Sequence, residues 1–217
     1  MADYARRRTT MVDTQVRPSD VTKFPIIEAM LRIPRELFVP DDKREAAYAG
    51  DNVDLGGGRV VLEPRTLAKM LEAADIQPDE MVLDIGAGYG YSTAVAAHLA
   101  EAVVALEEVP DLASEAERAL SEAGSDNAAV VEGNLNEGAA KHGPYDVILV
   151  EGAVQHIPEG ITNQLKDGGR IVAIFQEGTL GVVRVGYRID GQVNWRFAFN
   201  AGAPVLPGFE ASRAFVL

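Results

Sequence analysis

One short glycine-spaced loop limits what this chain can fold into more than any other stretch of its 217 residues. Residues 86–90 read Gly-Ala-Gly-Tyr-Gly, follow the apolar run 81–85 and precede a segment of helical composition at 91–99. Glycines between a strand and a helix permit a sharp turn and let a ligand approach the backbone. The unpaired N–H groups that open the helix can bind an anionic group. We therefore expect a strand, a tight turn and a helix, with a ligand against the turn.

The rest of the chain after this point alternates short apolar runs with helical segments. Strands are expected at 81–85, 102–106, 128–131, 147–150 and 170–175. Helices are expected at 64–74, 91–99, 110–123 and 158–165. This alternation indicates a parallel sheet with crossover helices. Two later runs, 182–189 and 193–199, are joined by Asp-Gly, a strong hairpin signal. The predicted fold class is α/β, a doubly wound, mostly parallel, Rossmann-like sheet with a C-terminal antiparallel hairpin.

The N-terminal part lacks this alternation. Residues 1–20 show no clear pattern, and we expect them to be irregular. Apolar residues at helical spacing predict a helix over 21–32. Short helical turns are expected at 35–39 and 41–48, and a glycine-rich loop at 52–61.

The length of the chain favours one domain, because 217 residues suit a single α/β core with an extension. We expect this domain to span 1–217. Within it, 1–63 would form an N-terminal helical extension with a substrate loop, and 64–217 would form the Rossmann-like core.

Charge and composition exclude several classes of partner. A net charge of −13 disfavours binding to nucleic acid, whose phosphates repel an acidic surface. The absence of cysteine excludes disulfides, zinc–thiolate sites and cysteine nucleophiles. The apolar runs are too short for a membrane span, and no apolar signal segment follows the first arginines. We expect a cytoplasmic protein without a metal, and the oligomeric state stays open.

The spacing of the glycines discriminates among cofactors. A dinucleotide fingerprint, G-x-G-x-x-G, would need a third glycine where Tyr91 or Thr93 stands. The observed G-x-G-x-G loop resembles that of class I S-adenosylmethionine (SAM) methyltransferases. The resemblance implies SAM as cofactor and S-adenosylhomocysteine (SAH) as product. The loop residues it places beside the cofactor are Asp84, Gly86, Ala87, Gly88, Tyr89 and Gly90.

Two further positions suit this cofactor. Glu107 ends the second expected strand, and a carboxylate about twenty residues past such a loop can accept both ribose hydroxyls. Asn134 follows the third strand, and its carbonyl oxygen can accept from the adenine amino group. Gly133 beside it would let the ring approach. The alternatives are a solvent-facing glutamate and an asparagine that serves only a turn.

The resemblance extends to one family within that superfamily. Residues 20–175 are similar to protein-L-isoaspartate O-methyltransferases. The matching stretches are 28–40, 82–90, 106–112, 145–150 and 165–170. The first of these is not general to SAM enzymes, which makes the resemblance specific. It implies a carboxyl O-methyltransferase that acts on isoaspartyl residues of damaged proteins, with a protein or peptide as its partner.

The substrate loop departs from that family. The family motif G-Q-T-I-S-x-P carries two hydroxyls at the substrate carboxylate. Aligned on its glycine and proline, this chain has Arg59, and the hydroxyl positions hold Val60 and Leu62. Arg59 could pair with a substrate carboxylate bidentately or form an internal salt bridge to Glu63. If Val60 and Leu62 fill the substrate pocket, a binding protein without catalysis becomes the better hypothesis.

A last pair of candidates follows the fourth expected strand. Glu151 and His156 lie where ligands bind in open α/β sheets, and they could act as an acid–base pair. His156 could equally be a surface residue. A carboxylate acceptor, with a pKa of about 4, needs no general base for in-line displacement. Three hypotheses remain: an isoaspartyl methyltransferase, a related methyltransferase for another acceptor, and a SAM-binding protein without activity.

Overall fold

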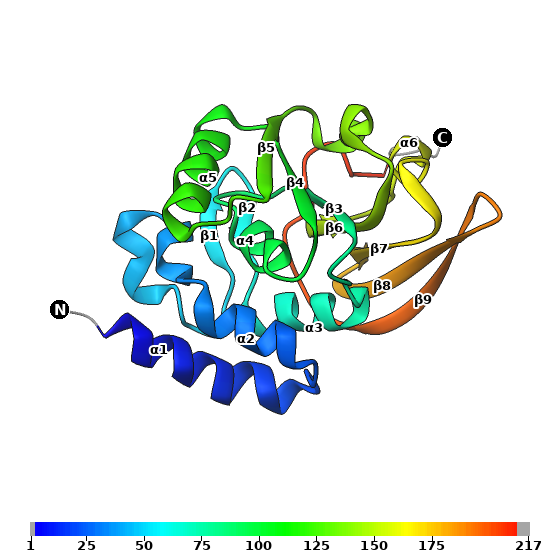
Figure 1. The fold of residues 1–217 in the computed structure, drawn as a ribbon. Helices are drawn as coiled ribbons and strands as arrows, with labels where there is room; N and C mark the ends of the chain where they lie inside the picture. The colour runs from blue at the N-terminus through cyan, green and yellow to red at the C-terminus, as the bar shows by residue number, and fades with distance from the viewer. Residues whose placement is uncertain (1–2, 212–217) are drawn as a thin grey trace.

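The computed structural model describes residues 3–211 (Figure 1). The strands of its large sheet are β3 (Met81–Ile85), β4 (Ala102–Glu107), β5 (Ala128–Glu132), β6 (Tyr145–Val154), β7 (Leu165–Glu177), β8 (Leu180–Ile189) and β9 (Gln192–Asn200). Their order is β5-β4-β3-β6-β7-β8-β9. Neighbours from β5 to β7 pair in parallel, and β8 and β9 pair antiparallel. The predicted fold class is confirmed.

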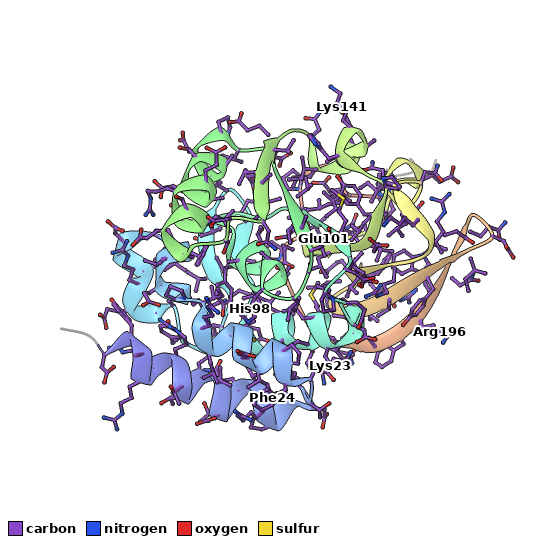
Figure 2. The ribbon with its side chains drawn as sticks, in the orientation of Figure 1. Lys23, Phe24, His98, Glu101, Lys141 and Arg196 are labelled. Carbon is purple, nitrogen blue, oxygen red and sulfur yellow. The ribbon has the colours of Figure 1, made fainter. Side chains whose placement is uncertain are left out.

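The two faces of this sheet are covered differently. One face packs against α3 (Pro64–Ala74), α4 (Tyr91–Ala97), α5 (Pro110–Ala123) and the N-terminal helices. The other face packs against η5 (Leu135–Glu137), η6 (Ala140–His142), α6 (Glu159–Thr162) and the segment 204–209. Figure 2 shows the side chains of both layers, with Phe24, Lys141 and Arg196 at the surface. The carboxyl ends of β3, β4 and β6 therefore lie between the helices on one face of the sheet and the elements on the other.

The helices that begin with proline follow the prediction closely. Pro64 and Pro110 occupy the first helical positions of α3 and α5, where the missing N–H costs no hydrogen bond. Both helices end at left-handed residues, Asp75 and Gly124. The helix expected over 158–165 is shorter, because Leu165 already pairs with Tyr145 as the first residue of β7.

The N-terminal segment is helical, so the prediction of irregular structure is wrong for residues 3–20. They form α1 (Tyr4–Met11), η1 (Val12–Val16) and η2 (Arg17–Ser19), which precede α2 (Phe24–Arg32). Figure 1 shows α1 and α2 side by side. Met11, Val12 and Val16 are buried, and η1 contacts α2 and α3. Tertiary burial therefore stabilises a helix whose own sequence is mostly polar.

A capping hydrogen bond starts this helix and can be tested. The Asp3 carboxylate accepts a hydrogen bond from the Arg6 backbone N–H at 3.0 Å. Loss of such a cap costs about 1 kcal/mol, so Asp3→Ala should lower the urea midpoint without changing the slope. Asp3→Asn keeps an oxygen acceptor and should unfold close to the wild type. Equal losses for both variants would mean that the charge matters and the cap does not.

The glycine-rich stretch 52–61 is a hairpin, where a loop was predicted. After η3 (Arg35–Phe38) and η4 (Asp41–Ala46), β1 (Val53–Gly56) pairs antiparallel with β2 (Arg59–Val61). Gly56, Gly57 and Gly58 all have positive φ, between 60° and 86°. Glycine adopts such angles readily, so the tight turn forms and its flanks pair. The hairpin directs Arg59 into the protein, where it is buried.

The segment after β9 returns to the large sheet. Val205 bridges to Ala153, and the Leu206 N–H donates to the Ala153 carbonyl at 2.8 Å. Leu206 and Phe209 are buried. This segment thus lies beside the end of β6. Across residues 3–211, the structure contains no helix with the length and apolarity needed to traverse a lipid bilayer.

Candidate functional site

The glycine loop after β3 has the geometry that the sequence predicted. Gly86, Gly88 and Gly90 have φ of +83°, +58° and +88°, values that other residues adopt only under strain. Gly90 precedes α4 in the left-handed conformation. The N–H of Gly86 donates to the carbonyl of Leu106 on β4 at 2.9 Å, so the loop is joined to the neighbouring strand.

Glu107 lies at this loop and is fully buried. Its Oε2 accepts from the Gly88 N–H at 2.8 Å. Its Oε1 accepts from the N–H groups of Glu108 and Val109 at 3.0 and 3.1 Å. These bonds hold the carboxylate in one orientation beside the turn. A ribose-binding role for Glu107 remains a prediction.

Arg59 reaches the same carboxylate from β2. Its Nη1 lies 2.8 Å from Oε1 of Glu107, and its Nη2 lies 2.8 Å from Oε2. The two side chains are 2% and 0% exposed. Glu63, the internal partner considered from the sequence, instead accepts from Thr66 at 2.6 Å. The fold therefore joins two residues that were predicted to contact different ligands.

The space beside the loop is also occupied by Leu206. A Cβ placed on Gly86 would lie 3.0 Å from Nη2 of Arg59 and 3.3 Å from Cδ1 of Leu206. A Cβ on Gly152 would lie 2.6 Å from Leu206. The close approach that these glycines allow is thus made by the chain's own side chains.

Two buried carboxyl groups lie near the loop, Asp84 on β3 and Glu151 on β6. Burial raises the pKa of Asp84 to about 6, although the hydroxyls of Ser92 and Thr93 donate to it at 2.7 and 2.5 Å. Burial, with the charge of Asp84, raises the pKa of Glu151 well above its usual range. Oδ1 of Asp84 and Oε1 of Glu151 have no hydrogen-bond partner among the described residues.

Arg35 is a buried part of the site that the sequence reasoning missed. Its Nε donates to the Ala47 carbonyl at 2.6 Å and its Nη2 to the Leu62 carbonyl at 2.7 Å. The guanidinium lies 4.6 Å from the centre of the Tyr91 ring. Burial lowers the pKa of Arg35, and the charge of Glu151 opposes that shift. The available signal was the arginine of the pair Arg35-Glu36, which stands between apolar residues in the stretch 33–39.

The remaining substrate-side candidates differ in how far each side chain is buried. Leu62 is 1% exposed, and Val60 is half-buried against the core. His156 is exposed whereas Glu151 is buried, and no hydrogen bond or ion pair joins them within the described part of the chain. Their action as an acid–base pair remains a prediction.

The adenine-side candidates lie at the end of β5. Asn134 is exposed, and its Nδ2 donates to Glu137 at 2.9 Å. The Gly133 N–H donates to the Glu107 carbonyl at 3.1 Å, which places the two strand ends together. A pocket of about 300 Å³ is lined in part by Leu106, Gly133 and Asn134. Across residues 3–211, no group of three or more His, Cys, Asp or Glu side chains is placed to hold a metal ion.

Comparisons with known proteins identify the family of this chain. The family model of protein-L-isoaspartate(D-aspartate) O-methyltransferase matches residues 6–197. Proteins named protein-L-isoaspartate O-methyltransferase from Syntrophus aciditrophicus and Methanoculleus marisnigri are each 39% identical to this chain. Each of these matches covers 79% of this chain and 79% of the relative.

Two solved structures share the fold. One, named protein-L-isoaspartate O-methyltransferase, has a TM-score of 0.78 at 24% identity. That match covers 94% of this chain and 65% of the other, so this chain spans about two thirds of that structure. A Plasmodium falciparum structure described under the same enzyme name, in complex with SAH, has a TM-score of 0.79 at 18% identity. That match covers 95% of this chain and 99% of the other. From the family match and the 39% identical relatives, the chain belongs to the protein-L-isoaspartate(D-aspartate) O-methyltransferase family.

Proposed function

We propose that this chain is a SAM-dependent carboxyl O-methyltransferase whose acceptor is an isoaspartyl residue of a protein or peptide. The observation that carries the proposal is the family match over 6–197, which includes the glycine loop and the buried Glu107 beside it. SAM supplies the methyl group, and SAH is the product.

Methylation of a carboxylate acceptor requires no general base from the protein. An isoaspartyl carboxylate has a pKa of about 4, so it is already the nucleophile at neutral pH. The side chains then have to align the carboxylate and exclude water, and no proton has to be removed. Asp84 and Glu151 are buried beside the loop, and this burial raises the pKa of each. Surroundings that keep water away suit this task.

The fit of the cofactor to these residues is incomplete in the conformation described. The open backbone of the glycine loop and the two oxygens of Glu107 suit a nucleoside with free ribose hydroxyls. Arg59 already takes both oxygens, and Leu206 lies against Gly86. In this conformation Arg59 and Leu206 occupy positions beside the loop that the proposed cofactor would use.

A second candidate function is a family member that binds SAM or SAH without transferring a methyl group. Leu62 is 1% exposed and its carbonyl accepts from Arg35, so the position holds neither a hydroxyl nor a free side chain. Val60 likewise offers no hydrogen bond to an acceptor. A related methyltransferase for another acceptor would use Glu151 or His156.

Transfer of radiolabelled methyl from SAM to an isoaspartyl peptide tests the main proposal. The matched control is the same peptide with an ordinary aspartyl residue. Base-labile label on the isoaspartyl peptide alone is expected. Label on neither peptide, together with SAH binding in a calorimetric titration, would contradict the proposal and favour the second candidate.

A further inference from the structure

The two oxygens of Glu107 would be needed by ribose hydroxyls, and both are taken by Arg59. The guanidinium forms two parallel bonds of 2.8 Å, the geometry in which arginine binds carboxylates most strongly. We propose that Arg59 and the cofactor compete for Glu107, so that the β1–β2 hairpin closes the cofactor site when no cofactor is bound. This inference rests on the proposed cofactor site, though not on methyl transfer.

Two leucines also lie over this loop, one from the same hairpin as Arg59 and one from the C-terminal segment. Leu206, from the segment after β9, lies against the positions of Gly86 and Gly152. Leu55, on β1, would be 2.7 Å from a Cβ on Gly88. Side chains from the hairpin and from the C-terminal segment thus meet over a turn whose glycines leave room for a ligand.

Among the described residues, Glu107 is the partner of both hydrogen bonds that the Arg59 side chain donates. Nε of Arg59 has no hydrogen-bond partner among the described residues, so Glu107 supplies the contacts of this buried guanidinium. Glu107 keeps three backbone N–H donors when Arg59 leaves, whereas Arg59 must move to water. The hairpin turn 56–58 is already exposed, which gives the strand a path outward.

A closed resting state lowers the apparent affinity for the cofactor. Only the open fraction binds, so the apparent Kd equals the intrinsic Kd divided by that fraction. Removal of the competing cation should therefore tighten binding. Gln at position 59, the residue in the family motif, is uncharged and too short to hold both oxygens from the same backbone position.

Calorimetric titration with SAH tests the competition on the full chain. Arg59→Gln should bind SAH at least about tenfold more tightly than the wild type. Arg59→Lys keeps the charge in the buried site but cannot bind both oxygens of Glu107 in the bidentate geometry of arginine. Its affinity for SAH should therefore lie between those of the wild type and Arg59→Gln. This second variant also guards against the first failing to fold, which circular dichroism would reveal.

The matched control is Arg170→Gln. Arg170 makes a similar bidentate pair with Glu80, at 2.6 and 2.7 Å, near the amino ends of β3 and β6. Its loss should leave the SAH affinity unchanged because the pair lies at the opposite edge of the sheet from the site.

The outcomes separate this inference from the proposed function. If folded Arg59 variants bind SAH no more tightly than the wild type, or none of them binds it, the competition is disproved. Weaker binding would make Arg59 a cofactor contact and would also overturn it. Tighter binding without methyl transfer to the isoaspartyl peptide would leave the competition standing and remove the proposed activity.

Discussion

Glu107→Gln is expected to lower the free energy of unfolding by about 3–5 kcal/mol. The reason is the charge that it leaves behind, because Arg59 is 2% exposed and would lose its carboxylate. An amide also turns one acceptor into a donor, which would face Nη1 or Nη2 of Arg59. Urea denaturation monitored by circular dichroism measures the loss.

A double variant separates the charge from the change of shape. Arg59→Gln combined with Glu107→Gln removes both charges and should recover at least half of the loss, since no uncompensated ion stays buried. Glu80→Gln is the matched control. Its partner Arg170 also donates to the carbonyls of Ala74 and Asp75, so a smaller loss is expected there. A loss at Glu107 no larger than at Glu80 would show that Arg59 is easily rehydrated.

Local sequence patterns predicted the elements whose ends are determined by residues adjacent in the sequence. The helices α3 and α5 were predicted at both ends, because proline and a left-handed cap act within the chain segment itself. The turn at Asp190 and Gly191 also followed, since both residues have positive φ as the hairpin signal requires. The glycine loop was predicted for the same reason.

Long-range contacts explain what the sequence did not predict. The helix α1 is mostly polar, and its stability comes from burial of Met11 together with Val12 and Val16 in η1, which α2 and α3 cover. Arg59 and Glu107 are 48 positions apart, and each was assigned to a ligand from its own local motif. A motif places one side chain at the rim of a sheet. It does not indicate that a second segment delivers the opposite charge to the same point.

The stability of the protein should fall as the pH rises from about 5 to about 8. Asp84 and Glu151 both have raised pKa values when folded, chiefly because they are buried. In the unfolded chain, both carboxyl groups ionise at about pH 4. Between those limits the folded chain binds more protons, so the stabilisation is complete below about pH 4 and is lost through about pH 6 and above. For Asp84, the change from 3.8 to about 6 corresponds to about 3 kcal/mol.

Glu151→Gln should flatten this dependence and raise the stability at about pH 8, because the amide has no charge to bury and no longer opposes ionisation of Asp84. Carboxyls with lowered pKa values act in the opposite direction but at lower pH. Asp75, whose pKa is lowered by its bond to Lys23, is one of these, and its contribution is lost only below about pH 4. Glu159→Gln, at an exposed position on α6, is the control. Unfolding free energies measured in urea from about pH 5 to about pH 8 decide the matter. If Glu151→Gln and the wild type lose stability in parallel, the burial of this carboxyl is not what makes the protein sensitive to pH.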